Sequence, residues 1–119
     1  MFTRKALAKK IQETIDLLIE NGIKPVRVIL FGSYAKGEVH EFSDVDLAIW
    51  SPVFTGDIMN DLETIRPVLR KCRGIDFKLY PEHATKENYD SFIEVIESTG
   101  KVIFEQKNEK LQDHVNALT

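Results

Sequence analysis

The chain has 119 residues, of which 43% are hydrophobic and 29% are charged, and its formal net charge is −3. This length fits one domain, and the slight negative charge excludes the strongly basic surface that is typical of direct nucleic-acid binders. The single cysteine excludes an intrachain disulfide, and no apolar run is long enough to span a membrane, so we expect a reducing, cytoplasmic environment.

The first half of the chain predicts a helix and two strands. Apolar side chains recur at spacings of three and four over residues 4–20, which predicts a helix that Thr3 can cap. Residues 26–31 are apolar and largely β-branched and predict a buried strand, and residues 44–50 predict a second one. Between the two strands, residues 32–43 are polar with two glycines, which indicates a loop or a short helical turn.

The middle of the chain predicts a helix followed by a third strand. Thr55 can cap a helix over residues 57–71, whose apolar side chains again fall on one face. Pro67 lies inside this pattern and should kink or split the helix. Residues 75–80 alternate between apolar and polar side chains and predict the third strand.

The last predicted elements are a helix over residues 86–98 and a short strand over residues 101–105. The side chains of this helix that we expect to point inward are Tyr89, Phe92, Ile93 and Ile96. The short link between the first two strands favours an antiparallel pair, and the helical crossover before the third strand favours a parallel one. The fold class is therefore α/β (α+β), a small mixed sheet with helices packed on it.

Three carboxylates are predicted to meet at one end of this sheet. Asp44 and Asp46 point to the same face of their strand, because alternate side chains share a face. If the third strand lies parallel beside the second, Asp76 lies next to this pair. Clustered carboxylates repel one another, and a bound cation removes the repulsion. Oxygen ligands of this kind suit Mg²⁺, Mn²⁺ or Ca²⁺ better than zinc.

The loop after the first strand contains candidate phosphate-binding groups. Gly32 permits a close approach of the backbone, and Ser33 adds a hydroxyl next to the N–H groups of a helical turn. In an antiparallel pair, the end of the first strand lies beside the start of the second, so this loop converges with the carboxylates. Lys36 can contact a phosphate or remain solvated, and Ser43 can contact a phosphate or cap a turn.

The segment from Gly32 to Gly37, followed by Ser43-Asp44-Val45-Asp46-Leu47, resembles the signature of the nucleotidyltransferase superfamily. The small size of the chain and its strand Ile75-Asp76-Phe77 are similar to minimal nucleotidyltransferase domains, which include the antitoxin partners of HEPN-domain toxins. The resemblance covers about residues 5–105. It implies the nucleotidyltransferase fold, with a domain over residues 1–105 and a tail over residues 106–119.

The resemblance also implies a reaction and the residues that perform it. Asp44 and Asp46 would bind two Mg²⁺ ions that bridge the triphosphate of ATP, and Asp76 would help bind the metal nearer the acceptor and activate its hydroxyl. Gly32 and Ser33 would hold the β- and γ-phosphates. The acceptor hydroxyl would attack the α-phosphate and release pyrophosphate. Family members of this size can transfer AMP to a tyrosine on the partner toxin.

Other interpretations of the whole chain remain open. It can be an antitoxin that masks its toxin partner by binding alone, or a small-molecule nucleotidyltransferase of the aminoglycoside-modifying type, although such enzymes usually carry an added domain. A homo-oligomer is also compatible with the small size. In the tail, Leu111, Val115 and Leu118 have helical spacing, which fits a partner-binding helix or a disordered terminus.

Three further side chains have two interpretations each. Tyr34 is a candidate for contact with the nucleotide or a partner, and Lys78, on the Asp76 face, can offset the acidic cluster or reach a phosphate. Trp50, on the Asp46 face, can form a wall near the site or cover the edge of the sheet. The histidines share no spacing that suggests a metal site and are expected at the surface; they are His40, His83 and His114.

Overall fold

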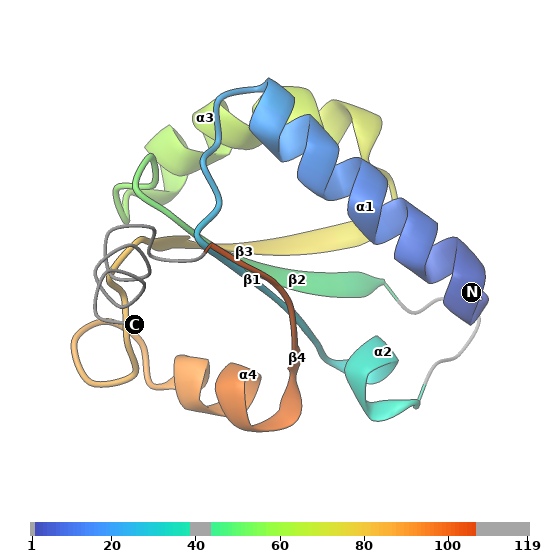
Figure 1. The fold of residues 1–119 in the computed structure, drawn as a ribbon. Helices are drawn as coiled ribbons and strands as arrows, with labels where there is room; N and C mark the ends of the chain where they lie inside the picture. The colour runs from blue at the N-terminus through green and yellow to red at the C-terminus, as the bar shows by residue number, and fades with distance from the viewer. Residues whose placement is uncertain (1, 39–43, 107–119) are drawn as a thin grey trace, which may run out of the picture.

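A computed structural model describes residues 2–38 and 44–106 (Figure 1). In chain order its elements are α1 (Arg4–Glu20), β1 (Arg27–Phe31), α2 (Ser33–Lys36), β2 (Val45–Ser51), α3 (Ile58–Lys71), β3 (Ile75–Pro81), α4 (Phe92–Thr99) and β4 (Lys101–Glu105). The predicted residues His40, Ser43 and His114, and positions 107–119 of the predicted tail, lie outside the described residues. Within the described part of the chain, no helix is long and apolar enough to cross a membrane.

The four strands form one mixed sheet in the order β3-β2-β1-β4. β1 pairs antiparallel with β2 and with β4, and β2 pairs parallel with β3. The predicted mixed sheet and both predicted strand orientations are therefore confirmed. β3 and β4 are the edge strands, on opposite sides of the sheet.

Alternating side chains of the sheet fill two separate apolar layers. Val45, Leu47 and Ile49 of β2 are fully buried against α1 and α3, which cover one face (Figure 1). Ala48 and Trp50 point to the other face, where α4 packs on the sheet. Because β2 is central and buried on both faces, its apolar side chains fix its register, and with it the position of Asp46.

Helix α3 begins later than Thr55 because Asp57 is its N-cap, with a side chain that accepts a hydrogen bond of 3.1 Å from the Asn60 N–H. The predicted cap is thus wrong. Thr55 instead donates through its N–H and hydroxyl to the buried carboxylate of Asp61. The predicted interruption at Pro67 is also absent, since α3 continues through it to Lys71. Pro67 is on the exposed side, where water can satisfy the carbonyl that the missing N–H leaves free.

Helix α4 is shorter than predicted because side-chain hydrogen bonds fold the preceding residues into turns. The Thr85 N–H donates to Asn88 Oδ1 over 2.8 Å, and the Phe92 N–H donates to Asp90 Oδ1 over 2.9 Å. Such local bonds compete with helix formation. Consequently Ile93 and Ile96 are buried as predicted, whereas Tyr89 and Phe92 are 47% and 37% exposed, contrary to the prediction.

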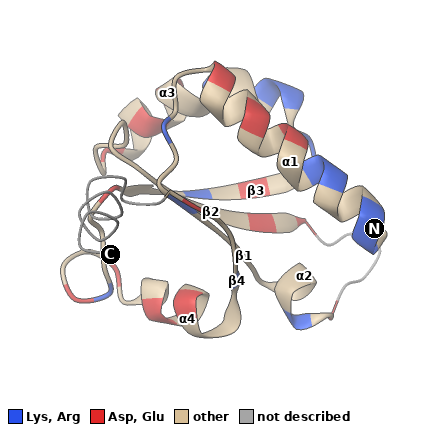
Figure 2. Cartoon of the chain, viewed as in Figure 1, with Lys and Arg blue, Asp and Glu red and all other residues tan. Residues whose placement is uncertain are grey.

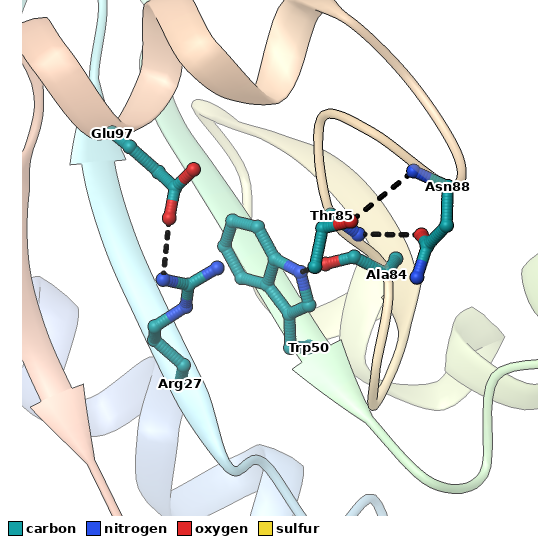
Figure 3. A network of polar contacts seen from close by, with 6 residues as sticks. All are labelled: Arg27, Trp50, Ala84, Thr85, Asn88 and Glu97. Carbon is teal, nitrogen blue, oxygen red and sulfur yellow. Dashed lines mark hydrogen bonds and ion pairs between the residues drawn. The ribbon is translucent and has the colours of Figure 1, made fainter.

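Trp50 is a core residue that fixes the chain segment after β3 (Figure 3). Its indole N–H donates a 2.9 Å hydrogen bond to the Ala84 carbonyl, and its ring stacks on Tyr80 with centroids 4.9 Å apart. The Arg27 guanidinium lies 3.9 Å from the ring centroid and forms a 2.9 Å ion pair with Glu97. Trp50 thus covers the sheet, as one of its two interpretations held, but it does so from the central strand β2 and not at the edge.

Replacing Trp50 with phenylalanine should lower the free energy of unfolding by about 1–3 kcal/mol, because the buried Ala84 carbonyl loses its donor. Arg27→Gln, which removes only a partly exposed ion pair and a stacked cation, should cost less than about 1 kcal/mol. Urea denaturation of both variants measures the difference. A Trp50→Phe variant as stable as the unmodified chain would show that the hydrogen bond does not anchor this segment.

Candidate active site

Two carboxylates lie side by side where β2 and β3 begin. Asp46 of β2 and Asp76 of β3 are register partners. Both point to the face of the sheet opposite the one that α1 and α3 cover. Asp44, which is exposed, immediately precedes β2 on the same face. Figure 2 shows these acidic segments of the two strands next to each other, at the same end of the sheet. The parallel pairing therefore brings all three predicted carboxylates to one place.

The backbone at Gly32 approaches the Asp46 carboxylate closely. Phe31, the last residue of β1, is the register partner of Asp46, so the chain leaves β1 directly beside this side chain. Gly32 has φ +71°, a conformation that favours glycine, and a β-carbon added there would overlap Asp46 Oδ2. The absence of a side chain at this position keeps Asp46 in place and leaves the adjoining backbone open.

The short helix α2 places Ser33 at its first position, directly after Gly32. A helix start leaves its first N–H groups without acceptors inside the helix, so they remain available to an anion. Ser33 is half-buried here, whereas Lys36 is exposed at the far end of α2. The structure thus brings Gly32 and Ser33 to the carboxylates.

Tyr34 does not extend into the site. Its side chain is buried in the layer under α1, and its hydroxyl accepts a 3.0 Å hydrogen bond from the Phe2 N–H. This tyrosine therefore ties α2 to the N-terminal segment, and its predicted contact with a nucleotide or partner is wrong. A tyrosine within a polar loop gives no periodic signal, so its burial could not be read from the sequence.

Charge repulsion at the carboxylates favours a bound cation. Burial raises the pKa of Asp46 above its ordinary value, and the neighbouring charges of Asp76 and Asp44 raise it further. A divalent cation would relieve this repulsion, and oxygen ligands with this much charge suit Mg²⁺. Among the described residues, no three acidic, histidine or cysteine side chains already form a complete cluster for a metal ion. Mg²⁺ ordinarily takes only one or two carboxylates and completes its shell with phosphate and water, so the residues fit such an ion.

Sequence reasoning missed Asp90, which connects the start of α4 to β3. Its carboxylate accepts a 3.2 Å hydrogen bond from the Tyr80 hydroxyl and lies 3.8 Å from Lys78 Nζ. Burial, with the charge of Asp90, raises the pKa of Tyr80. Lys78 Nζ also lies 4.8 Å from the centroid of the Phe92 ring, so this ammonium group is held near the site. The only available signal was the Asp90-Ser91-Phe92 sequence, which is typical of a helix start.

Several solved structures share this fold. A protein from Sulfolobus solfataricus assigned as a nucleotidyltransferase has a TM-score of 0.61 and 14% identity, over 84% of this chain and 81% of that one. One chain of a toxin-antitoxin complex with AMP-PNP has a TM-score of 0.57 and 24% identity, over 92% and 89%. A chain of the Shewanella oneidensis complex of a tri-AMPylated HEPN toxin with an MNT antitoxin has a TM-score of 0.55 and 20% identity, over 93% and 82%.

These likenesses show the nucleotidyltransferase fold, as the sequence predicted. No curated protein matches the chain in sequence. The sequence profile of the family described as nucleotidyltransferase domain matches residues 11–115. Because this match spans most of the sequence and includes both the Gly32-Ser33 loop and the three carboxylates, the chain belongs to the nucleotidyltransferase domain family.

Proposed function

We propose that this protein transfers a nucleoside monophosphate, AMP from ATP, to a hydroxyl group in a Mg²⁺-dependent reaction. The observation that carries the proposal is the convergence of Gly32-Ser33 with Asp46 and its register partner Asp76. A phosphate-binding backbone and a cluster of oxygen ligands at one point are the two requirements of phosphoryl-group chemistry.

Each residue of the site has a proposed role. Gly32 and Ser33 bind the β- and γ-phosphates, with Lys36 and Ser43 as outer phosphate contacts. Asp44 and Asp46 hold two Mg²⁺ ions with the triphosphate, and Asp76 completes the ion site on the acceptor side. Bound Mg²⁺ would supply charge stabilisation for the attacking and the leaving oxygens.

Asp76 also has the proposed task of preparing the acceptor. It orients the acceptor hydroxyl and takes its proton as the new oxygen–phosphorus bond forms at the α-phosphate. The bond between the α-phosphorus and its bridging oxygen breaks, and pyrophosphate leaves. An in-line arrangement follows if the triphosphate lies on the Gly32 side of Asp46 and the acceptor on the Asp76 side, because these two residues flank Asp46.

The acceptor that we propose is a protein, a HEPN-domain toxin for which this chain acts as the antitoxin. The fold likeness to chains of toxin-antitoxin complexes supports such a partner. The tri-AMPylated toxin of the Shewanella oneidensis complex supports AMP as the transferred group.

The test is transfer from ATP labelled at the α-phosphate. The purified chain is incubated with this ATP, Mg²⁺ and either a HEPN partner or a lysate of its source, beside the Asp44→Asn/Asp46→Asn variant. Label on one protein band with the unmodified chain alone supports the proposal and identifies the acceptor. Equal labelling by the variant, or no labelling with any of the four nucleoside triphosphates, would contradict it.

The fold likeness to chains of toxin-antitoxin complexes also favours a second candidate function, in which the chain neutralises a toxin by masking it. In this case the folded Asp44→Asn/Asp46→Asn variant still co-purifies with the toxin and still restores growth of cells that express it. Loss of protection by a folded variant that still binds the toxin would count against masking and in favour of transfer.

A further inference from the structure

An apolar groove runs along the free edge of β3 and ends at Asp76. It encloses about 440 Å³, and its floor is formed by β3 from Ile75 to Tyr80. Side chains of α3, including Ile58 and Leu62, form one wall, and the segment at Tyr89 forms the other. Since β3 is first in the strand order, no other strand of the described chain covers this edge.

The main chain of β3 presents hydrogen-bonding groups to this groove. In a parallel pair, the N–H and C=O of one residue point to the same side, and successive residues alternate. The Gly74 carbonyl accepts from the Val45 N–H over 2.9 Å, so the even-numbered residues of β3 face β2. By this alternation, the N–H and C=O groups of the odd-numbered residues point to the open edge; these are Ile75, Phe77 and Leu79.

The walls of the groove expose large apolar side chains. Ile58 is 74% exposed, Leu62 is 43% exposed and Tyr89 is 47% exposed. A free strand edge flanked by apolar walls is the arrangement that receives an added strand, in which the main chain supplies affinity and alternate side chains fill pockets.

The charges of the groove favour a neutral or weakly basic polypeptide. Asp61 is buried and accepts hydrogen bonds from Thr55 and Gly56, and Asp90 lies 3.8 Å from Lys78 Nζ, which leaves the carboxylate of Asp76 at the end of the groove. Among the described lining residues Lys78 is the only cation, so the groove disfavours a nucleic-acid backbone, which requires cations to neutralise its phosphates. A second copy of this chain is disfavoured because each copy has a net charge of −3.

We propose that the groove receives an extended segment of the protein acceptor, which pairs with β3 as an added strand and presents its hydroxyl to Asp76. The inference rests on the proposed function, in which the acceptor is a protein. Directly opposite residues on paired strands share a face, with β-carbons roughly 5 Å apart. The residue opposite Asp76 therefore projects onto the face that holds Asp46, where its hydroxyl can meet the α-phosphate.

The test is amide hydrogen exchange of the full chain with a synthetic peptide, Lys-Val-Thr-Tyr-Thr-Val-Lys. This peptide has the same length as β3, seven residues. Without peptide, the amides of Asp76 and Lys78 should exchange slowly and those of Phe77 and Leu79 quickly. Saturating peptide should slow Phe77 and Leu79 about tenfold or more. A peptide N-methylated at alternate residues on its pairing edge should have no such effect.

Two matched variants link this binding to the groove. Leu62→Asn removes an apolar side chain from the wall without adding charge and should weaken peptide binding about tenfold. Val95→Asn, at a similarly exposed residue on α4 outside the groove lining, should leave peptide binding unchanged; the two side chains are 43% and 45% exposed. Both variants should bind ATP like the unmodified chain, so a failure of the groove is distinguishable from a failure of the nucleotide site.

Other outcomes overturn the inference. Unchanged exchange at Phe77 and Leu79 with saturating peptide would show that β3 accepts no added strand. Equal protection by the N-methylated peptide would exclude main-chain pairing. Slow exchange of the Phe77 and Leu79 amides without peptide would assign the edge to another occupant. That occupant is a second copy if the protection depends on protein concentration, and the chain's own residues 107–119 if the protection does not.

Discussion

Asp46→Asn should abolish nucleotidyl transfer and, at the same time, raise the stability of the Mg²⁺-free protein. Burial and the charges of Asp76 and Asp44 raise the pKa of Asp46, so its ionised form destabilises the folded state at neutral pH. A neutral amide removes that repulsion. The same change removes a ligand for the cation, and we expect transfer to fall on the order of 1000-fold, as it does when central electrostatic groups are removed from other active sites.

Thermal unfolding with and without Mg²⁺ measures the stability half of this prediction. Mg²⁺ should raise the unfolding temperature of the unmodified chain. Asp46→Asn should have a higher unfolding temperature without Mg²⁺ and a smaller increase when Mg²⁺ is added. Asp16→Asn, which alters an exposed carboxylate of α1, is the control and should behave like the unmodified chain in both conditions. Equal stabilisation of all three proteins by Mg²⁺ would mean that the cation binds elsewhere.

Gly32→Ala should reduce transfer about 100-fold, whereas Gly37→Ala should leave it nearly unchanged. Both glycines have positive φ, but Gly37 has ψ +15°, in the left-handed helical region, where alanine costs about 1–2 kcal/mol of backbone strain. Gly32 has ψ −151°, in a region that is essentially restricted to glycine, so alanine is more strained there. The two glycines also differ in their surroundings, because a β-carbon at Gly32 overlaps Asp46 Oδ2 and one at Gly37 has nothing within 4 Å. A displaced carboxylate misplaces the reacting groups, and small displacements of this kind can cost about 100-fold in rate.

Parallel measurements of unfolding and of label transfer separate the two effects. Gly37→Ala should lose some stability and little transfer, whereas Gly32→Ala should lose more stability and, at a temperature where it is still folded, about 100-fold in transfer. If both variants transfer label equally well, the close approach of Gly32 to Asp46 has no part in the reaction.

The positions of the candidate catalytic groups could be predicted because they follow from strand pairing. A link of about a dozen residues joins β1 to β2, and a helical crossover joins β2 to β3, so the two orientations were fixed by connection length. The alternation of side chains then placed Asp46 and Asp76 on one face. No tertiary detail was needed for this step.

The details that could not be predicted depend on tertiary contacts or on competition between side-chain caps. Thr55 and Asp57 are both good N-cap residues, and the burial of Asp61 beneath Thr55 decides between them. The start of α4 depends on the side chains of Thr85, Asn88 and Asp90, whose bonds override an apolar pattern that continues through Tyr89.

The groove along β3 also could not be predicted from the sequence. It exists because β4 pairs with β1 and leaves β3 at the edge of the sheet. The composition of β4 gives no indication of which edge it joins, since a short apolar strand fits either one. The sequence therefore identified Asp76 as a candidate without revealing the open main chain beside it.

The most direct test of the central claim is an equilibrium titration of ATP into the purified chain, in Mg²⁺ and in EDTA, with the Asp44→Asn/Asp46→Asn variant alongside. We predict saturable binding of ATP by the unmodified chain only in Mg²⁺, and a large loss of affinity in the folded variant. Equal affinity in EDTA, or unchanged binding by the variant, would contradict the account, because the nucleotide would then be held without the carboxylates that β2 and β3 bring together.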